Sequence, residues 1–135
     1  MLPDRIIEQG TLEKRGARAA ISVRIPWYRA LPLSSITGVE FAIDGHDIER
    51  DSLTWTVNGT TYTLDELPPR FDEWWYVLDS AVIEGDWPEA VAVKGEHTVR
   101  AKVGLYIPYL PAGPGFIAIG EQDIKTMPVK EGVTA

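Results

Sequence analysis

Histidine and carboxylate side chains are the groups of this chain that could bind a metal ion or transfer protons. His46 lies in a predicted turn and His97 near the start of a predicted strand, and neither has a second histidine close to it in the sequence. A metal site needs several such ligands close together. The spacing therefore favours a structural or solvated role for each histidine. Convergence with Asp44, Asp47 or Glu96 in three dimensions stays open as the alternative.

Acidic pairs at Asp72–Glu73 and Asp44–Asp47 could serve as the acid and base of a glycosidase. That reaction needs two carboxylates on opposite sides of a cleft, and nothing in the sequence places either pair in this way. The chain contains no G-x-S-x-G motif for a nucleophilic serine. The glycines at 113 and 115 lack the lysine of a phosphate-binding loop. We therefore expect no catalytic, cofactor-binding or metal-binding residue in this chain.

The segment RIPWYRALPL, residues 24–33, is instead typical of a contact site. Its prolines remove backbone donors and cannot continue a sheet ladder. Trp27, Tyr28 and Arg29 are consecutive, so in an extended or turn conformation they cannot all point into one core. These residue types are enriched at binding hot spots. The alternative is a strand end at which Trp27 covers the core and Arg29 is solvated.

The chain contains five tryptophans, which could together form a platform that stacks against sugars. A tryptophan buries a large area when it enters a core, so a folded domain is expected to use some of them internally. A stand-alone carbohydrate-binding module therefore stays an alternative to an interaction subunit. The tryptophans are Trp27, Trp55, Trp74, Trp75 and Trp87.

Alternation of apolar and polar residues predicts strands along much of the chain. Ala19–Ile25 and Val39–Ile43 each place apolar residues on one face. The stretch 97–103 alternates in the same way. The run WWYVL at 74–78 could form a short helix, but its β propensity favours a strand. The chain is therefore expected to fold mainly into strands.

Turn residues separate these strands. Asn58-Gly59 predicts a tight hairpin between two β-rich runs, and Asp44-Gly45 predicts a second tight turn. The prolines that follow the stretch 97–103 predict that its strand ends or bulges near Pro108.

Other segments are expected to interrupt the strands. Glu84–Pro88, EGDWP, predicts a break, and a short helical turn is expected near Leu31–Ile36 or Pro69–Trp74. No segment shows a sustained period of 3.6 residues. Short strands with turn chemistry between them predict an all-β fold, an antiparallel β-sandwich of the jelly-roll or immunoglobulin-like kind.

Length and charge narrow the classes of function. The 135 residues fit a single β-sandwich domain, with a C-terminal tail from about 128 that is expected to fray. A formal net charge of −7 disfavours nucleic acid and anionic membranes as partners. The chain has no cysteine, and neither its N-terminal residues nor any later run resembles an export signal or a membrane span. We expect a cytoplasmic protein.

The segment Val23–Gly45, VRIPWYRALPLSSITGVEFAIDG, resembles the small β subunit of C-glycoside deglycosidases. The shared pattern is V-R-[IL]-P-[WY]-Y-R-x-L-P-L-S followed by a strand that ends in D-G. The similarity continues through the Asn58-Gly59 hairpin, the LPPRF and EWWYVLD stretches, the G-E-H-x-V strand and the LYIPYLP corner. It therefore covers most of the chain.

This resemblance implies a β-sandwich that packs on a larger, TIM-barrel α subunit. The α subunit would hold a divalent metal, expected to be manganese, and supply the catalytic base. The implied substrate is a 3-oxo-C-glycoside of a flavonoid or anthraquinone. Its ketone acidifies the C2 proton, and loss of this proton gives an enolate that expels the aromatic carbon from C1. The present chain would be the accessory subunit of this carbon–carbon lyase and would not be catalytic alone.

We expect the contact surface for the α subunit, which could also border the substrate entrance, to be formed by two proline-rich and aromatic segments. Arg24 and Arg29 are the candidates for charge-assisted bonds to acidic groups of the partner. The expected contact residues are Arg24, Pro26, Trp27, Tyr28, Arg29, Leu31, Pro32, Tyr106, Pro108 and Tyr109.

Overall fold

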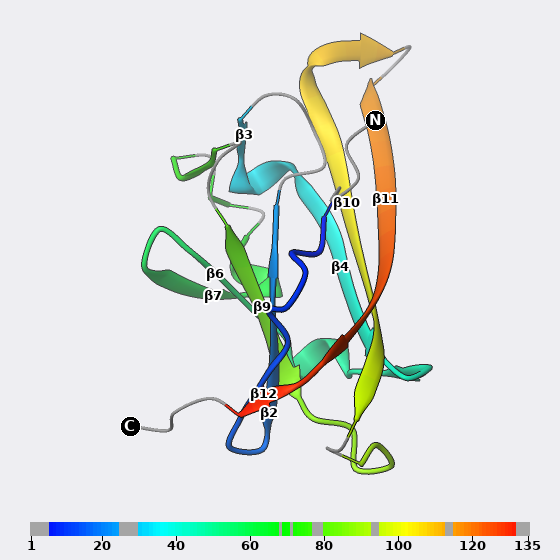
Figure 1. Ribbon diagram of the computed structural model, residues 1–135. Coiled ribbons are helices and arrows are strands. Elements are labelled where there is room, and N and C mark those ends of the chain that lie inside the picture. Colours follow the sequence, from blue (N-terminus) through cyan, green and yellow to red (C-terminus); the bar gives the residue numbers. More distant parts are fainter. Residues whose placement is uncertain are drawn as a thin grey trace.

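Two β-sheets face each other across a hydrophobic core in the computed structural model of the chain (Figure 1). The structure describes residues 6–24, 30–67, 69–70, 72–76, 80–92, 95–112 and 115–131, and for 106–112, 115–119 and 131 it describes the backbone alone. Within these residues the helical elements are single 3-10 turns. The prediction of an all-β sandwich is confirmed.

One sheet contains six strands. Neighbouring strands in it run antiparallel, except that β12 runs parallel to β1. In order across the sheet, the strands are β12 (Lys130–Glu131), β1 (Glu13–Arg15), β2 (Arg18–Val23), β9 (Ala81–Asp86), β6 (Thr54–Val57) and β7 (Thr60–Thr63).

The second sheet contains four antiparallel strands. In order, they are β11 (Gly115–Pro128), β10 (Glu96–Ala112), β4 (Ile36–Ile43) and β5 (His46–Asp47). The long β10–β11 hairpin extends beyond the other strands at the upper end of the molecule in Figure 1. A register shift between Ile107 and Pro111 confirms the predicted irregularity near Pro108, because proline cannot donate to the ladder.

A separate two-stranded ribbon joins β3 (Leu31–Pro32) to β8 (Trp74–Trp75). The 3-10 turn η1 (Leu33–Ser35) follows β3 directly, in agreement with the helical turn expected there. Two further turns, η2 (Arg50–Ser52) and η3 (Leu64–Glu66), precede β6 and follow β7. The ribbon thus ties the segment before β4 to the segment before β9.

Both predicted tight turns are present. Asp44 and Gly45 have φ angles of 51° and 82°, and Asn58 and Gly59 have φ angles of 54° and 80°. Positive φ at both central positions is the requirement of a type I′ turn, which asparagine, aspartate and glycine tolerate best. Local sequence chemistry therefore sets the β4–β5 and β6–β7 connections.

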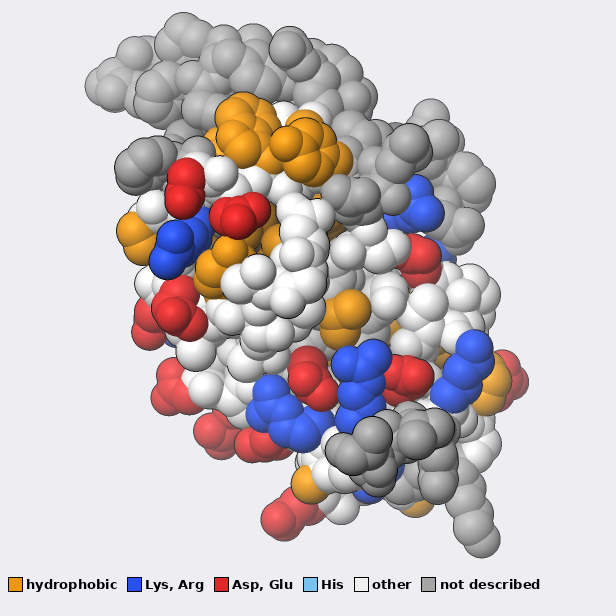
Figure 2. Space-filling model, turned by 90° about the vertical axis from the view of Figure 1, so that its left-hand side faces the viewer, with side chains coloured by type: hydrophobic (Ala, Val, Ile, Leu, Met, Phe, Trp, Pro, Cys, Tyr) orange, Lys and Arg blue, Asp and Glu red, His pale blue; other side chains and the backbone are white. Residues whose placement is uncertain are grey.

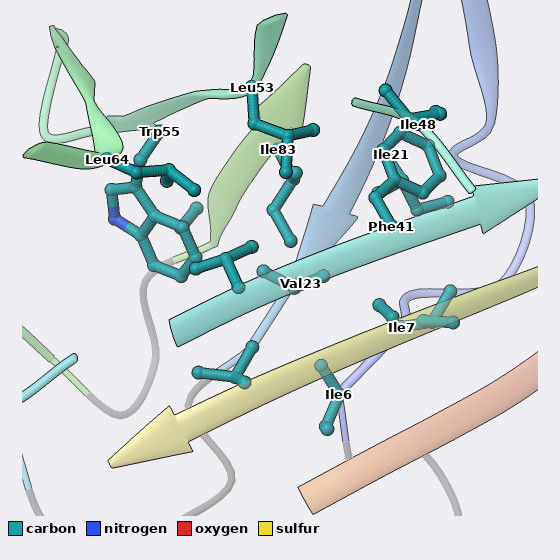
Figure 3. Close-up of a cluster of buried hydrophobic side chains, with 14 of the residues drawn as sticks. Ile6, Ile7, Ile21, Val23, Phe41, Ile48, Leu53, Trp55, Leu64 and Ile83 are labelled. Carbon is teal, nitrogen blue, oxygen red and sulfur yellow. The ribbon is translucent and has the colours of Figure 1, made fainter. Parts of the chain in front are cut away.

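The core is formed by the inward faces of both sheets. Along β10 the odd-numbered residues from His97 to Leu105 are buried, whereas Thr98 and Lys102 are exposed. Figure 3 shows side chains from the N-terminal segment, both sheets and the connecting turns in one cluster. The labelled members are Ile6, Ile7, Ile21, Val23, Phe41, Ile48, Leu53, Trp55, Leu64 and Ile83.

The predicted break at Glu84–Pro88 is wrong for its first half, because β9 continues through Asp86 and pairs with both β2 and β6. Gly85 belongs to this strand for a packing reason. A Cβ at Gly85 would lie 2.5 Å from Ile48 Cγ2 and 2.8 Å from Leu53 Cδ2. Glycine is needed here because the side chains of Ile48 and Leu53 pack closely against the strand, and it does not form a turn.

The first residues of the C-terminal segment pair with the N-terminal part of the chain. Pro128 ends β11, and β12 pairs with β1 through the register Glu13 with Lys130. The Lys130 N–H donates a hydrogen bond to Leu12 O at 2.8 Å. Lys130 and Glu131 therefore belong to the six-stranded sheet. Their pairing with β1 is parallel, so this sheet is not strictly antiparallel.

Candidate functional site

The expected contact residue Arg24 follows β2 directly. Its N–H donates to Ile6 O at 2.7 Å, and its Nε lies 3.5 Å from Glu8 Oε1. The side chain is 43% exposed. Arg24 therefore has an acidic neighbour within its own chain, and its side chain is still partly exposed to solvent.

Leu31 and Pro32 differ from the sequence expectation because their side chains are buried within this chain. They form β3 and pair with Trp75 and Trp74 of β8. A buried side chain cannot contact a partner directly. These two residues support the surface around them and are not part of it.

The other expected contact residues lie outside the side chains that the structure describes. Pro26, Trp27, Tyr28 and Arg29 lie outside the described residues. Tyr106, Pro108 and Tyr109 lie in β10, and only their backbone is described.

Exposed aromatic side chains occur at the β3–β8 ribbon and directly after it. Trp75 is buried, and its ring meets that of Trp55 edge to face, with centroids 4.8 Å apart and an angle of 82° between the planes. Trp74 and Tyr76, on either side of Trp75 in the chain, are 41% and 53% exposed. The list of contact residues drawn from the sequence omitted both. Alternation around a buried central tryptophan was the signal that could have identified them.

Three hydrogen bonds fix the backbone beneath these rings. Leu33 N–H donates to Glu73 O at 2.9 Å, and Ser34 N–H donates to Arg70 O at 3.0 Å. The side chain of Asn58, in the β6–β7 turn, donates through Nδ2 to Trp74 O at 3.0 Å. The ribbon is therefore attached both to η1 and to the neighbouring hairpin.

The histidines were the other candidates for chemistry, and the structure separates them. His46 is exposed, whereas His97 is buried and its Nδ1 lies 2.7 Å from Asp44 Oδ2. The Trp87 ring meets the His97 ring edge to face with centroids 5.5 Å apart. The structural role that the spacing favoured thus fits His97, and the convergence with Asp44 that was left open occurs as a pair.

The electrostatics of Asp44 reflect this pairing. Partial burial alone raises the pKa of Asp44, but hydrogen bonds from His97 and from the Thr98 N–H outweigh burial, so the net pKa is lowered. The Thr98 N–H reaches Asp44 Oδ1 at 2.8 Å. In the part of the chain that the structure describes, no group of three or more histidine, cysteine, aspartate or glutamate residues could hold a metal ion.

Two shallow hollows lie beside β4. The larger has a volume of about 210 Å³ and is lined in part by Phe41, Asp47 and Arg50, and the smaller has about 50 Å³. Sites for drug-sized ligands usually have volumes of about 300–1,000 Å³. Neither hollow is large enough to enclose a glycoside with an aromatic aglycone.

Among the described residues, no helix is long and apolar enough to cross a membrane.

Comparison of the sequence with known protein families identifies a match along most of the chain. The sequence profile of the C-glycoside deglycosidase beta subunit matches residues 8–109. The chain belongs to this family. The C-glycoside deglycosidase beta subunit of Microbacterium trichothecenolyticum is 49% identical over 128 residues, which cover 94% of this chain and 96% of the relative.

Two further relatives also match over nearly their full lengths. The C-glycoside deglycosidase beta subunit of Arthrobacter globiformis is 48% identical over 97% of this chain and 99% of its own length. The 3′-dehydrocarminate deglycosidase beta subunit of a Microbacterium species is 38% identical over 97% of this chain and 98% of its own length. The family resemblance drawn from the VRIPWYRALPL segment is confirmed. As a deglycosidase beta subunit, this chain is an accessory subunit of an enzyme and has a partner subunit.

Proposed function

We propose that this chain is the β subunit of a heteromeric enzyme that cleaves the carbon–carbon bond between a 3-oxo-glucosyl group and an aromatic aglycone. The observation that carries the proposal is family membership along nearly the whole chain, with 94% of this chain and 96% of a named beta subunit aligned. One relative is named for 3′-dehydrocarminate, a name whose prefix denotes oxidation at the 3′ position. The proposed substrate class, an oxidised C-glycoside of a flavonoid or anthraquinone, agrees with that name.

The reaction is a base-assisted elimination. The ketone at C3 of the sugar acidifies the C2 proton, so a base can remove this proton and form an enolate. The electron pair then moves to form a C1–C2 double bond, the bond from C1 to the aromatic carbon breaks, and that carbon takes up a proton. We propose that the base belongs to a TIM-barrel α subunit. A divalent metal held there, manganese in our proposal, would act as a Lewis acid toward the sugar oxygens.

The role of this chain is to assemble with the α subunit and border its active site. We propose that Arg24, Trp27, Tyr28 and Arg29, together with the β10 corner, contact the α subunit. Arg24 keeps 43% of its side chain exposed beside Glu8, so a carboxylate of the partner can still reach its guanidinium group. The corner residues proposed for this contact are Tyr106, Pro108 and Tyr109, and Pro26 lies in the same motif as Trp27.

Co-expression with the adjacent reading frame tests this function. A stable complex should form, and the complex should release the aglycone from a 3-oxo-C-glucoside, whereas this chain alone should not. Recovery of this chain as an unassociated monomer, beside a partner that is fully active without it, would contradict the proposal.

A stand-alone carbohydrate-binding module is the alternative. The burial of three of the five tryptophans removes most of the argument for it. Trp55, Trp75 and Trp87 are buried, so they cannot form a platform for sugars. Calorimetric titration of the isolated chain with glucosides checks this alternative directly. A measurable heat of saccharide binding would revive it.

A further inference from the structure

Trp74 of β8 and Tyr76, which follows β8 directly, are exposed aromatic residues outside the core, and we call them the aromatic pair. Among the described residues, the large hydrophobic side chains that are exposed are Trp74, Tyr76 and Ile124, at 41%, 53% and 54%. Trp74 and Tyr76 are two positions apart, whereas Ile124 lies on β11. Adjacent exposed aromatics are more informative than a single exposed aliphatic residue, because scattered apolar residues are normal on protein surfaces.

The chain geometry explains why both rings are outside. Successive side chains of an extended segment point to opposite faces. Trp75 is anchored in the core by its edge-to-face contact with Trp55 at 4.8 Å. Residues 74 and 76 are therefore directed away from the core together. Neither ring can enter the core of this chain unless Trp75 leaves its place against Trp55.

Hydrogen bonds within this chain fix the backbone at Glu73 and Trp74. Asn58 Nδ2 donates to Trp74 O at 3.0 Å, and Leu33 N–H donates to the carbonyl of the preceding residue, Glu73, at 2.9 Å. Aromatic side chains on a fixed backbone lose little conformational entropy on binding. These features are those of a preorganised contact site.

Arg70 and Asp72, close to the aromatic pair in the chain, form an ion pair with each other. Arg70 Nη1 lies 3.6 Å from Asp72 Oδ2, and the Arg70 guanidinium lies 5.7 Å from the centre of the Tyr62 ring. Figure 2 shows hydrophobic side chains gathered near the upper end of this side of the molecule, with acidic and basic side chains below them. An apolar centre beside polar groups that satisfy one another is the usual composition of a protein interface.

We propose that Trp74 and Tyr76 are buried against the large subunit when the deglycosidase assembles. This inference rests on the proposed function. The ribbon is continuous with the proposed contact segment, because β3 begins at Leu31, directly after the WYRA sequence, and pairs with β8. As a family of beta subunits, these chains have a partner subunit that must cover part of their surface. The aromatic pair adds a rigid apolar contact beside the arginine-bearing segment.

Measurement of the dissociation constant of the full complex tests the proposal. The double variant Trp74→Ala with Tyr76→Ala should raise Kd about 100-fold or more, since paired aromatic anchors are typical hot spots. Ile124→Ala is the matched control, because it removes an equally exposed hydrophobic side chain from a different strand, and its Kd should stay within about twofold of the parent value.

Thiol protection provides a second readout that does not depend on a truncated variant folding well. The chain has no cysteine, so Tyr76→Cys and Ile124→Cys each introduce a single thiol that maleimide can label. Assembly with the large subunit should slow labelling at position 76 about tenfold or more and at position 124 less than about twofold, because a buried thiol is not accessible to the reagent.

The outcomes separate the two proposals. If the parent chain forms the complex but the double variant binds equally well and the thiol at position 76 stays equally reactive, the aromatic pair is not in the interface and the proposed function stands. If the parent chain forms no complex with the large subunit, both proposals are overturned.

Discussion

The imidazole of His97 and the carboxylate of Asp44 are 53 positions apart in the chain and join at 2.7 Å between Nδ1 and Oδ2. The histidine side chain is 2% exposed and the aspartate side chain 36%. This pair attaches the β4–β5 turn to the start of β10, because the same carboxylate accepts the Thr98 N–H. The group that the sequence offers for acid–base chemistry is thus used to hold two strands together.

Acid should weaken the fold in part through Asp44. The pKa of Asp44 is lowered from its ordinary value of 3.8 when the chain is folded. A lowered folded-state pKa contributes stability above the unfolded value, and this contribution is lost as pH falls through the folded-state value. Urea unfolding at a series of pH values should show a smaller acid-induced loss in Asp44→Asn than in the parent chain. Identical acid dependence in both proteins would rule out this role for Asp44.

The two neighbouring tryptophans of β8 should respond differently to truncation. Trp75→Ala removes a fully buried ring in contact with Trp55 and should lower the free energy of unfolding by about 3–5 kcal/mol. Trp74→Ala removes an exposed ring and should cost less than about 1 kcal/mol in the isolated chain. Denaturant unfolding of both variants measures the difference. Equal losses would contradict the burial pattern of the ribbon.

Gly85 should not tolerate a methyl group. The Cβ of Gly85→Ala would lie 2.5 Å from Ile48 Cγ2, so the variant should lose about 1–3 kcal/mol of stability. Gly38→Ala is the control, because a Cβ at this β4 position meets no atom within 4 Å. Thermal unfolding of the pair checks the prediction, and a Gly85→Ala variant as stable as Gly38→Ala would refute it.

Asn58 has two separable roles, one in its turn and one at the ribbon. Asn58→Ala should destabilise the chain by about 1–2 kcal/mol, because alanine is strained at a φ of 54° and cannot donate to Trp74 O. Asn58→Gly keeps the turn and loses only the hydrogen bond, so its loss of stability should be smaller. Hydrogen exchange of the β3–β8 amides should speed up in both variants. Unchanged exchange in both would show that Asn58 does not hold the ribbon.

Much of the fold was predictable because its signals are local. Alternation along Val39–Ile43 and along 97–103 identified β4 and the inward face of β10. Positive φ at Asn58-Gly59 and Asp44-Gly45 followed from residue type alone. Family membership was also readable from contiguous residues in Val23–Gly45, and the comparison over 8–109 confirms it.

The errors share a different origin. The break predicted at Glu84–Pro88 overlaps the last three residues of β9, because a glycine and a proline close together suggest a turn. Gly85 instead allows close packing against Ile48 and Leu53. The pairing of Lys130 with Glu13 was missed because it joins opposite ends of the chain.

By itself, the sequence determined the strand periods, the two tight turns and the family, since each depends on neighbours within a few positions or on one continuous motif. Only the tertiary structure decided that Leu31 and Pro32 are buried, that His97 pairs with Asp44, and that Trp74 faces solvent while Trp75 does not. These outcomes depend on which surfaces meet after distant segments pack together. A local sequence pattern cannot predict which side chains become buried or paired. The free energy of burial depends on all the residues that surround a side chain and not on its position in the chain.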